Sequence, residues 1–352
     1  MSPRTNLVTQ PTLPSLNIPV FPSTRYQGSK LKLLDWIWAN IQDLPFDTAL
    51  DAFGGTGCVS HMLKSKGKQV AYNDILRFNY LIGLALIEND ATTLAEEDVA
   101  FLLTRHEDVR YPTFIQDTFH DIYFTDDENR WLDMVITNIR NLDDKYKRAI
   151  AYFALFQACV IKRPYNLFHR KNLYMRTSDV QRSFGNKTTW DTPFEVWFRQ
   201  FSIFSNGRQN VAMNYDAFEI PGQYDLVYID TPYISDRGIG VDYFHFYHFL
   251  EGIVDYDNWA RRIDYRSKHR KLKQKKSVWT DKNRIHDAFD GLFEKFQDSI
   301  LVVSYRDHGI PSPDELVTLL RKHKGNVVEV NSTDYKYVLS NGNSRELLFI
   351  AQ

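Results

Sequence analysis

The sequence predicts an α/β protein with a long helical insertion in its middle. Apolar runs of strand length alternate with amphipathic helical patterns over residues 46–74, and again from about residue 224 to the C-terminus. Between these two parts the patterns are mostly helical, as in "DKYKRAIAYFALFQACVI". Because this alternation is typical of a sheet covered by helices, we expect one sheet built from both parts of the chain.

The first part predicts a strand–helix–strand unit. "FDTALDAFGGTG" is an apolar run that ends in glycines, "CVSHMLKSKG" fits an amphipathic helix closed by Gly67, and "KQVAYND" fits a second strand. The preceding "GSKLKLLDWIWANI" fits a helix. Its predicted apolar face consists of Leu31, Leu34, Trp38 and Ile41.

The last part predicts further strands and a closing hairpin. "YDLVYIDTPY" and "SILVVSY" each fit a buried strand, and "NVVEVNS" fits another strand. Ser312 and Glu315 have the spacing of a capping box at the start of a helix. Asn341-Gly342 predicts the tight turn of a β-hairpin.

Composition excludes several classes of protein. No apolar stretch approaches the ~20 residues of a membrane span, and the N-terminus has no signal pattern, so we expect a cytoplasmic protein without membrane contact. Cys58 and Cys159 are expected to be free core thiols, and no metal-ligand spacing is present. His245 and His248 stand three apart among aromatic residues and are expected to be core or groove residues.

The net charge is −1, but the basic residues are concentrated in two stretches. Residues 162–176 hold five Lys or Arg and no acid, and residues 261–276 hold nine against one Asp. Both are candidates for binding a polyanion, although charged stretches are often only solvated faces. Tyr165, Phe168 and Tyr174 are interleaved with the charges of the first stretch. We favour this stretch because of its position before the region expected to recognise the partner.

The glycine loop predicts a cofactor that contains a nucleoside. Glycines between a strand and a helix allow close approach of a ligand to the backbone. Asp74 follows at the end of the next strand, where a carboxylate can accept the hydroxyl protons of a ribose. A dinucleotide fingerprint would need a third glycine or alanine where Ser60 stands. Carboxylates such as Asp51 and Asp230 instead suit the cationic groups of S-adenosylmethionine, but a nicotinamide cofactor stays open at this point.

The turn "DTPY" suggests the reaction. Its strand should deliver Asp230 to the carboxyl end of the sheet. A carboxylate and a backbone carbonyl can together accept both N–H groups of an exocyclic amine and direct its lone pair at a methyl donor. Pro232 fixes the turn, and Tyr233 offers a flat face for stacking a base. The three residues therefore suit methylation of a base amine.

Taken in order, "RYQGSKLKLLDWI", "DAFGGTG", "YND" and "DTPY" resemble the N6-adenine DNA methyltransferases of the Dam type, especially those that accompany restriction enzymes. The resemblance implies a Rossmann-like S-adenosylmethionine-dependent fold with a helical and loop target-recognition insertion. It implies catalysis by Asp230, Pro232 and Tyr233. It also implies cofactor contacts from Tyr26, Lys30, Asp51, Phe53, Gly54, Gly55, Thr56, Gly57, Asp74, Asp216, Phe218 and Asp230. Thr231 departs from the family, which usually has Pro there.

With this resemblance, the chain divides into four parts. Residues 1–20 are expected to be a flexible arm, and residues 21–90 to form the first part of the catalytic domain with the cofactor motifs. Residues 91–205 are the expected target-recognition insertion, and residues 206–352 the second catalytic part.

The implied partner is double-stranded DNA, from which the target adenine must be flipped out. The resemblance also implies a cognate restriction endonuclease in the same system, and a monomer is the simpler state. Three alternatives stay open. They are a methyltransferase of RNA or of a protein amide, a nicotinamide-dependent oxidoreductase, and a DNA-binding module without catalysis.

Overall fold

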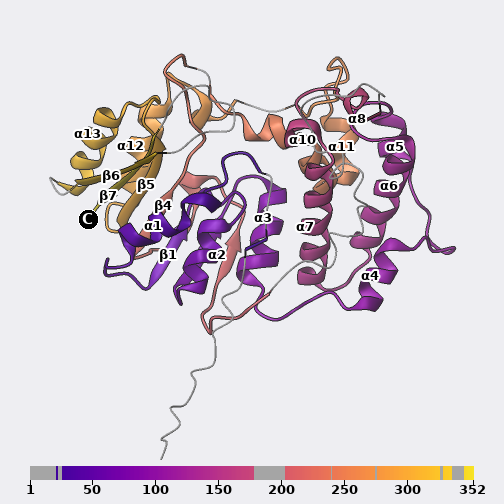
Figure 1. Ribbon diagram of the computed structural model, residues 1–352, viewed down its shortest axis with the longest axis horizontal. Coiled ribbons are helices and arrows are strands. Elements are labelled where there is room, and N and C mark those ends of the chain that lie inside the picture. Colours follow the sequence, from indigo (N-terminus) through magenta and orange to yellow (C-terminus); the bar gives the residue numbers. More distant parts are fainter. Residues whose placement is uncertain are drawn as a thin grey trace, which may run out of the picture.

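The computed structural model describes residues 21–22, 26–177, 203–238, 240–273, 276–325, 328–334 and 345–352. A sheet with helices on both faces forms one half, and a group of helices stands beside it (Figure 1). The expected N-terminal arm, the end of the insertion and the turn at Asn341-Gly342 lie outside the described residues.

The elements follow the predicted order. The strands are β1 (Thr48–Asp51), β2 (Gln69–Asn73), β3 (Val211–Met213), β4 (Leu226–Ile229), β5 (Ile300–Arg306), β6 (Val328–Asp334) and β7 (Arg345–Ala351). The helices are α1 (Leu34–Ile41), α2 (Cys58–Ser65), α3 (Arg77–Gly83), α4 (Glu96–Leu103), α5 (Phe114–Thr118), α6 (Asp126–Arg140), α7 (Lys145–Ile161), α8 (Tyr174–Thr177), α10 (Tyr243–Val254), α11 (Trp259–Arg262), α12 (Ile285–Lys295) and α13 (Pro313–Lys324).

The seven strands form one sheet in the order β3-β2-β1-β4-β5-β7-β6. The strands from β3 to β5 pair in parallel, whereas β7 is antiparallel to both of its neighbours. The predicted α/β class and methyltransferase-like sheet are confirmed, because the hairpin of β6 and β7 closes an otherwise parallel sheet.

Alternating residues of the strands supply two separate cores. On one face, Ala49 and Tyr228 pack with the apolar sides of α1, α2, α3 and α7. On the other face, Leu50 and Val227 pack with α12 and α13. Burial on both faces explains why β1, β4 and β5 are continuous apolar runs. The edge strand β6 is mostly exposed and polar.

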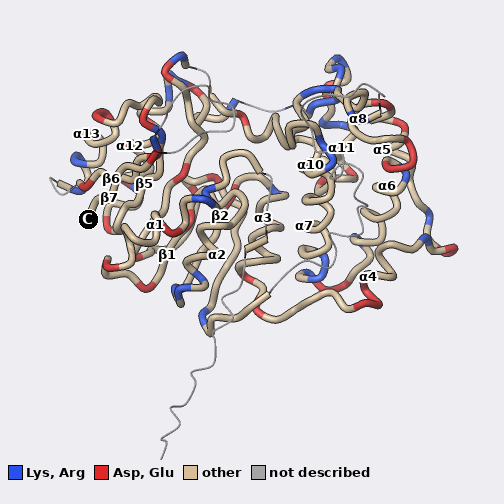
Figure 2. Tube along the Cα trace, viewed as in Figure 1, with Lys and Arg blue, Asp and Glu red and all other residues tan. Residues whose placement is uncertain are grey.

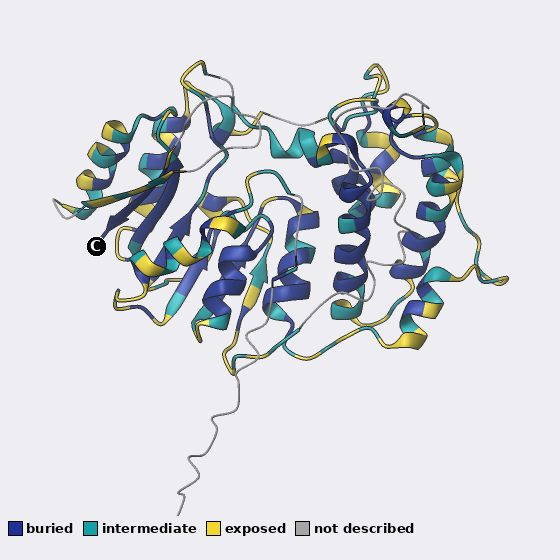
Figure 3. Cartoon of the chain, viewed as in Figure 1, coloured by how far each residue is buried: buried dark blue, intermediate teal, exposed yellow. Residues whose placement is uncertain are grey.

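The helical half is built from two separate parts of the sequence. Helices α4 to α7 come from the predicted insertion, and α7 is buried along most of its length (Figure 3). Helices α10 and α11 follow the DTPY turn, yet residues such as Phe249 and Trp259 belong to the same core as α6 and α7. A boundary at residue 205 therefore does not separate the two halves in space, and the four-part division stays a prediction.

Several local predictions can be compared with the structure. Ser312 caps α13 in a capping box with Glu315, as predicted. The predicted face of α1 is partly wrong: Leu33, Ile37 and Ile41 are buried, whereas Leu31, Leu34 and Trp38 are only partly buried. A short 3₁₀ turn over Leu31–Leu33 precedes the α-helix and shifts its register.

Both cysteines are free and buried, as predicted. Among the described helices, none has the length and apolar character needed to cross a membrane.

Candidate active site

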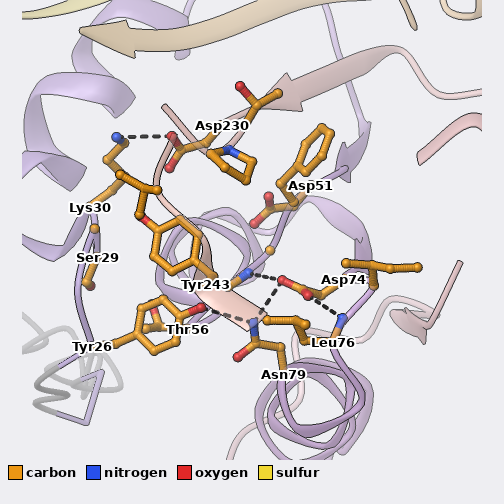
Figure 4. A pocket seen from close by; sticks show the side chains of 18 of the residues that line it. Tyr26, Ser29, Lys30, Asp51, Thr56, Asp74, Leu76, Asn79, Asp230 and Tyr243 are labelled. Carbon is orange, nitrogen blue, oxygen red and sulfur yellow. Dashed lines mark hydrogen bonds and ion pairs between the residues drawn. The ribbon is translucent and has the colours of Figure 1, made fainter. Parts of the chain in front are cut away.

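A pocket of about 840 Å³, including its open mouth, lies at the carboxyl ends of β1, β2 and β4 (Figure 4). The order of strands along the chain reverses between β1 and β4. Such a switch point is where open α/β sheets bind ligands. The predicted site residues that line the pocket are Tyr26, Lys30, Asp51, Phe53, Gly54, Gly55, Thr56, Asp74, Asp230 and Pro232.

The glycine loop connects β1 to α2 and forms one wall of the pocket. Gly55 has a φ of +52°, a conformation that side chains rarely adopt. A Cβ on Gly54 would lie 2.1 Å from the ring of Tyr72, so no larger residue fits there. Gly57, with a φ of +76°, begins α2 behind this wall and does not line the pocket. The glycines therefore expose backbone to any ligand that enters.

Asp51 ends β1 and is almost fully buried below the glycine loop. The Ser60 hydroxyl donates to its Oδ2 over 2.7 Å. Burial raises the pKa of Asp51 to about 7, although this hydrogen bond opposes the shift. The neighbouring charges of Asp51 are the carboxylates of Asp230 and Asp74, so this end of the pocket suits a cationic ligand.

Asp74 follows β2 and binds the loops on both sides of it. It accepts hydrogen bonds from the backbone N–H of Gly55 (2.9 Å) and Leu76 (2.8 Å) and from the Asn79 side chain (3.0 Å). Burial nevertheless raises the pKa of Asp74 to about 6. A carboxylate has about four acceptor positions, so roughly one remains for a ligand.

Asp230 lies just beyond β4 and faces the pocket. Its Oδ1 lies 3.1 Å from the ammonium of Lys30 and accepts from the hydroxyl of Tyr233 over 3.0 Å. Burial raises the pKa of Asp230 to about 6, and the charge of Lys30 acts in the opposite direction. Pro232 also lines the pocket, as does the buried Thr231 that stands where the family usually has Pro.

Tyr233 does not present the open face that its predicted role requires. Its side chain is 7% exposed and does not line the pocket. Its ring packs edge-on against Tyr305 at 5.1 Å, and its hydroxyl contacts Lys30, Asp230 and Glu346. The arrangement turns the hydroxyl, rather than a ring face, toward Asp230.

An aromatic stack forms the opposite wall. Tyr26 lies between Tyr247 (ring centroids 4.4 Å apart) and Tyr243 (5.7 Å), with all rings nearly parallel. Its hydroxyl accepts a hydrogen bond from Asn79, so the stack is linked to Asp74. Tyr243 also lines the pocket, together with Tyr26.

Asp216 and Phe218 lie outside the main pocket. Asp216 instead lines a small adjoining pocket together with Phe53, Asp74 and Trp279. Phe218 is half-exposed and stacks on Trp279, with ring centroids 5.6 Å apart. The two residues are therefore close to the pocket that holds Asp74, on its far side from Asp230.

Sequence reasoning missed several residues of the site. Asn79, Tyr243, Ser277 and Thr280 line the pocket, and Glu346 lies behind it in contact with Lys30. Asn79 follows the Asp74 motif by five residues, a local signal that could have been used. Nothing in the sequence brings Glu346 to Lys30, because 316 positions separate them.

His245 and His248 join His269 in a cluster within the helical half, with ring centroids between 5.3 and 6.2 Å apart. Burial lowers the pKa of all three. Among the described residues, no group of His, Cys, Asp or Glu side chains could hold a metal ion.

The pocket chemistry fits S-adenosylmethionine. Four of its lining side chains are carboxylates (Asp51, Asp74, Asp230 and Asp242), whereas the lining contains one lysine and no arginine. This excess of negative charge matches the sulfonium and ammonium of the cofactor. The exposed backbone of Gly54 and Gly55 allows its amino-acid part to approach closely.

Comparison with known proteins agrees with this geometry. Residues 26–308 match the model of the D12 class N6 adenine-specific DNA methyltransferases. The type II methyltransferase M2.HphI of Haemophilus parahaemolyticus is 30% identical over 96% of this chain and 99% of its own length. M.CviAII of Paramecium bursaria Chlorella virus 1 is 25% identical over 90% of this chain and 93% of its own length. M.FokI of Planomicrobium okeanokoites is 27% identical over 85% of this chain, but only 47% of that longer protein is matched. The chain therefore belongs to the D12 class N6 adenine-specific DNA methyltransferases, and it methylates the N6 amine of adenine in DNA with S-adenosylmethionine as the methyl donor.

Proposed function

We propose that this enzyme modifies adenine at a specific sequence in double-stranded DNA, as the modification partner of a cognate restriction endonuclease. It would act in the cytoplasm as a monomer on one strand at a time. The names of its relatives as type II methyltransferases support the pairing with an endonuclease. The observation that carries the catalytic part is the convergence of Asp51, Asp74 and Asp230 with the glycine loop in one pocket.

The carboxylates bind different parts of the cofactor, which supplies the methyl group. Asp51 and the backbone of Phe53 to Thr56 hold its amino-acid part, and Lys30 and Tyr26 complete that end of the pocket. Asp74 accepts a ribose hydroxyl at its remaining acceptor position. Asp216 and Phe218 flank the adenine ring of the cofactor, and the small pocket that Asp216 lines beside Phe53 supports this assignment.

Asp230 binds the amine of the flipped adenine. Its carboxylate accepts one N–H and the carbonyl in the turn fixed by Pro232 accepts the other, so the nitrogen lone pair faces the methyl group. The ring of Tyr233 must turn before it can stack on the base, because the ring is buried and its hydroxyl is held by Asp230. Tyr243, whose side chain already lines the pocket, is a second stacking surface.

The structure changes the order of the two DNA-binding candidates. In residues 162–176, Lys162 and Arg176 both bind Glu128, Lys171 binds Asp121, and Arg163 is 1% exposed. These internal partners leave little of the first stretch for phosphates, so our preference for it is not supported.

The second stretch is more accessible. Residues 263–272 form a short hairpin, closed by the Ile263–Leu272 bridge, which projects above α11 with basic residues at its tip (Figure 2). Arg266 is 95% exposed and pairs only weakly with Asp264, at 3.4 Å. Arg262 and Lys276, at its base, line a cleft that shares Leu76, Asp242 and Ser277 with the active-site pocket. We therefore propose that this hairpin contacts the DNA backbone beside the flipped base.

Transfer of labelled methyl to duplex DNA tests the proposal. The expected product is N6-methyladenine at one short sequence, and treatment of the product with DNase should release the label whereas RNase should not. Asp230→Ala should lower kcat by roughly 100-fold or more while cofactor binding is largely kept. Label spread over all sequences, or full activity of Asp230→Ala, would contradict the proposal.

A further inference from the structure

A buried charge cluster lies directly behind the catalytic carboxylate. Lys30 precedes α1, Asp230 and Tyr233 follow β4, and Glu346 is the second residue of β7. The ammonium of Lys30 lies 3.1 Å from Asp230 and 2.9 Å from Glu346, and it also contacts the Tyr233 hydroxyl. Lys30 is 4% and Glu346 0% exposed, whereas the Asp230 side chain is 18% exposed toward the pocket. Asp230 is therefore the most accessible member of the cluster.

The hydrogen bonds of the cluster fit its donors. An ammonium has three donors, and Lys30 has three partners at this site: Asp230, Glu346 and Tyr233. The Tyr233 hydroxyl has one proton but two carboxylates in reach, Asp230 at 3.0 Å and Glu346 at 2.9 Å. Its proton can therefore point to only one of them at a time.

Glu346 is fixed from behind. Its Oε1 also accepts a hydrogen bond from the Ser304 hydroxyl on β5 over 2.6 Å. β7 pairs with β5 over six residue pairs, so the backbone of Glu346 is held by the sheet. A side chain anchored in this way can fix the position of Lys30 and Tyr233.

We propose that Glu346 is a positioning residue for methyl transfer, which holds Lys30 and Tyr233 so that they fix the orientation and the negative charge of Asp230. This role rests on the proposed action of Asp230 on the target amine. The contacts from Lys30 and Tyr233 both go to Oδ1 of Asp230, which leaves Oδ2 for the amine. When the amine binds, the Tyr233 hydroxyl can donate its hydrogen bond to Glu346 instead of to Asp230.

The charges around Asp230 give the proposal a signed pH effect. The groups that face it are Lys30, Glu346 and Tyr233, together with Asp51 on β1 and Tyr228 on β4. Burial raises the pKa of Asp230 to about 6, Lys30 lowers it and Glu346 raises it. Since the ionised form accepts the amine, activity should fall as the pH falls through this pKa.

Two substitutions should move the acid limb of the kcat–pH profile in opposite directions. Glu346→Gln removes a negative charge and should move the limb to lower pH by half a unit or more. Lys30→Met removes the counter-charge and should move it to higher pH. Glu346→Gln should also lower kcat at least 10-fold with less than a threefold change in KM for the cofactor, because the carboxylate loses its fixed orientation.

Asp133→Asn is the matched control. Asp133 on α6 is also a buried carboxylate, which accepts from the backbone N–H of Ile115, but it lies in the helical half. Its loss should lower the melting temperature and leave the acid limb unmoved. If Glu346→Gln fails to fold, Glu346→Asp can be used instead, because it keeps the negative charge but places it farther from Lys30. This variant should lower kcat, whereas its acid limb should stay near that of the wild type.

An unmoved or raised acid limb in folded Glu346→Gln, or a wild-type kcat in folded Glu346→Asp, would overturn the role of Glu346. Either result in an active enzyme leaves the proposed function intact. A wild-type chain that does not methylate adenine would instead contradict the proposed function itself.

Discussion

Both halves of the molecule bury basic side chains, and Lys30 in one and Arg163 in the other are neutralised differently. In the sheet half, Lys30 contacts two carboxylates at the edge of the pocket. In the helical half, Arg163 donates to the backbone carbonyls of Tyr123, Leu167 and Arg170 and to the side chain of Asn172. Burial lowers the pKa of Arg163 to about 9, whereas the charges of Asp230 and Glu346 outweigh burial and raise the pKa of Lys30.

The difference separates a structural cation from one that tunes a reactive group. Arg163 supplies hydrogen bonds to a loop that would otherwise leave buried carbonyls unpaired. In the proposed mechanism, Lys30 supplies charge to Asp230, whose ionised form accepts the amine. A basic residue near aromatic residues in sequence therefore does not by itself indicate DNA binding, since Arg163 belonged to our preferred DNA-binding stretch.

The largest expected effect that tests this comparison is on stability. Arg163→Met should lower the free energy of unfolding by about 3 kcal/mol, because the loop carbonyls lose their donors. The cofactor KM of the protein that remains folded should not change. Denaturant unfolding measures the free energy of unfolding, and steady-state kinetics measures the cofactor KM. If Arg163→Met changed the pH profile of activity without losing stability, the distinction between a structural Arg163 and a tuning Lys30 would be contradicted.

A second prediction concerns the pH dependence of cofactor binding. Burial raises the pKa of Asp51 to about 7, and in the proposed mechanism only its ionised form attracts the cofactor cation. If only the ionised form binds, affinity should fall about 10-fold between pH 8 and pH 6. Calorimetry in buffers of different ionisation enthalpy should also detect release of a proton near neutral pH.

Asp51→Asn serves as the control for that measurement. Its amide does not titrate, so cofactor affinity should be weaker and nearly independent of pH over the same range. Equal pH dependence in the variant and the wild type would assign the effect to another group.

The smallest effects are expected at the basic hairpin. Arg266→Ala and Lys268→Ala should each weaken DNA binding about threefold to fivefold at moderate salt, and each should reduce the slope of log K against log salt concentration by about 1. Arg130→Ala on α6 is the matched control, because this exposed arginine pairs only with Asp127. Binding lost equally in all three variants would exclude a specific role for the hairpin.

Local patterns predicted much of the fold and part of the site. The glycine loop, Asp74 and the DTPY turn are each set by a few neighbouring residues, and all lie at one edge of the sheet because parallel strands end there. The capping box of α13 is also set by residues that are close in sequence, Ser312 and Glu315, so the sequence predicts it.

Features that depend on distant segments were not predicted. The contact of Lys30 with Glu346 and the packing of α10 beside α7 join parts of the chain that no sequence pattern connects. The internal pairing of Lys162 and Arg176 with Glu128 is a similar case, since charge counts over one stretch do not include a carboxylate from α6. The orientation of Tyr233 depends on the same cluster behind the pocket.

A crystal structure of the enzyme with a non-reactive cofactor analogue and a duplex that contains the target sequence tests the central claim most directly. We expect the analogue between the glycine loop and Asp74, and the amine of one extruded adenine within hydrogen-bond distance of the Asp230 carboxylate. An analogue bound elsewhere, or an adenine amine remote from Asp230, would contradict the account.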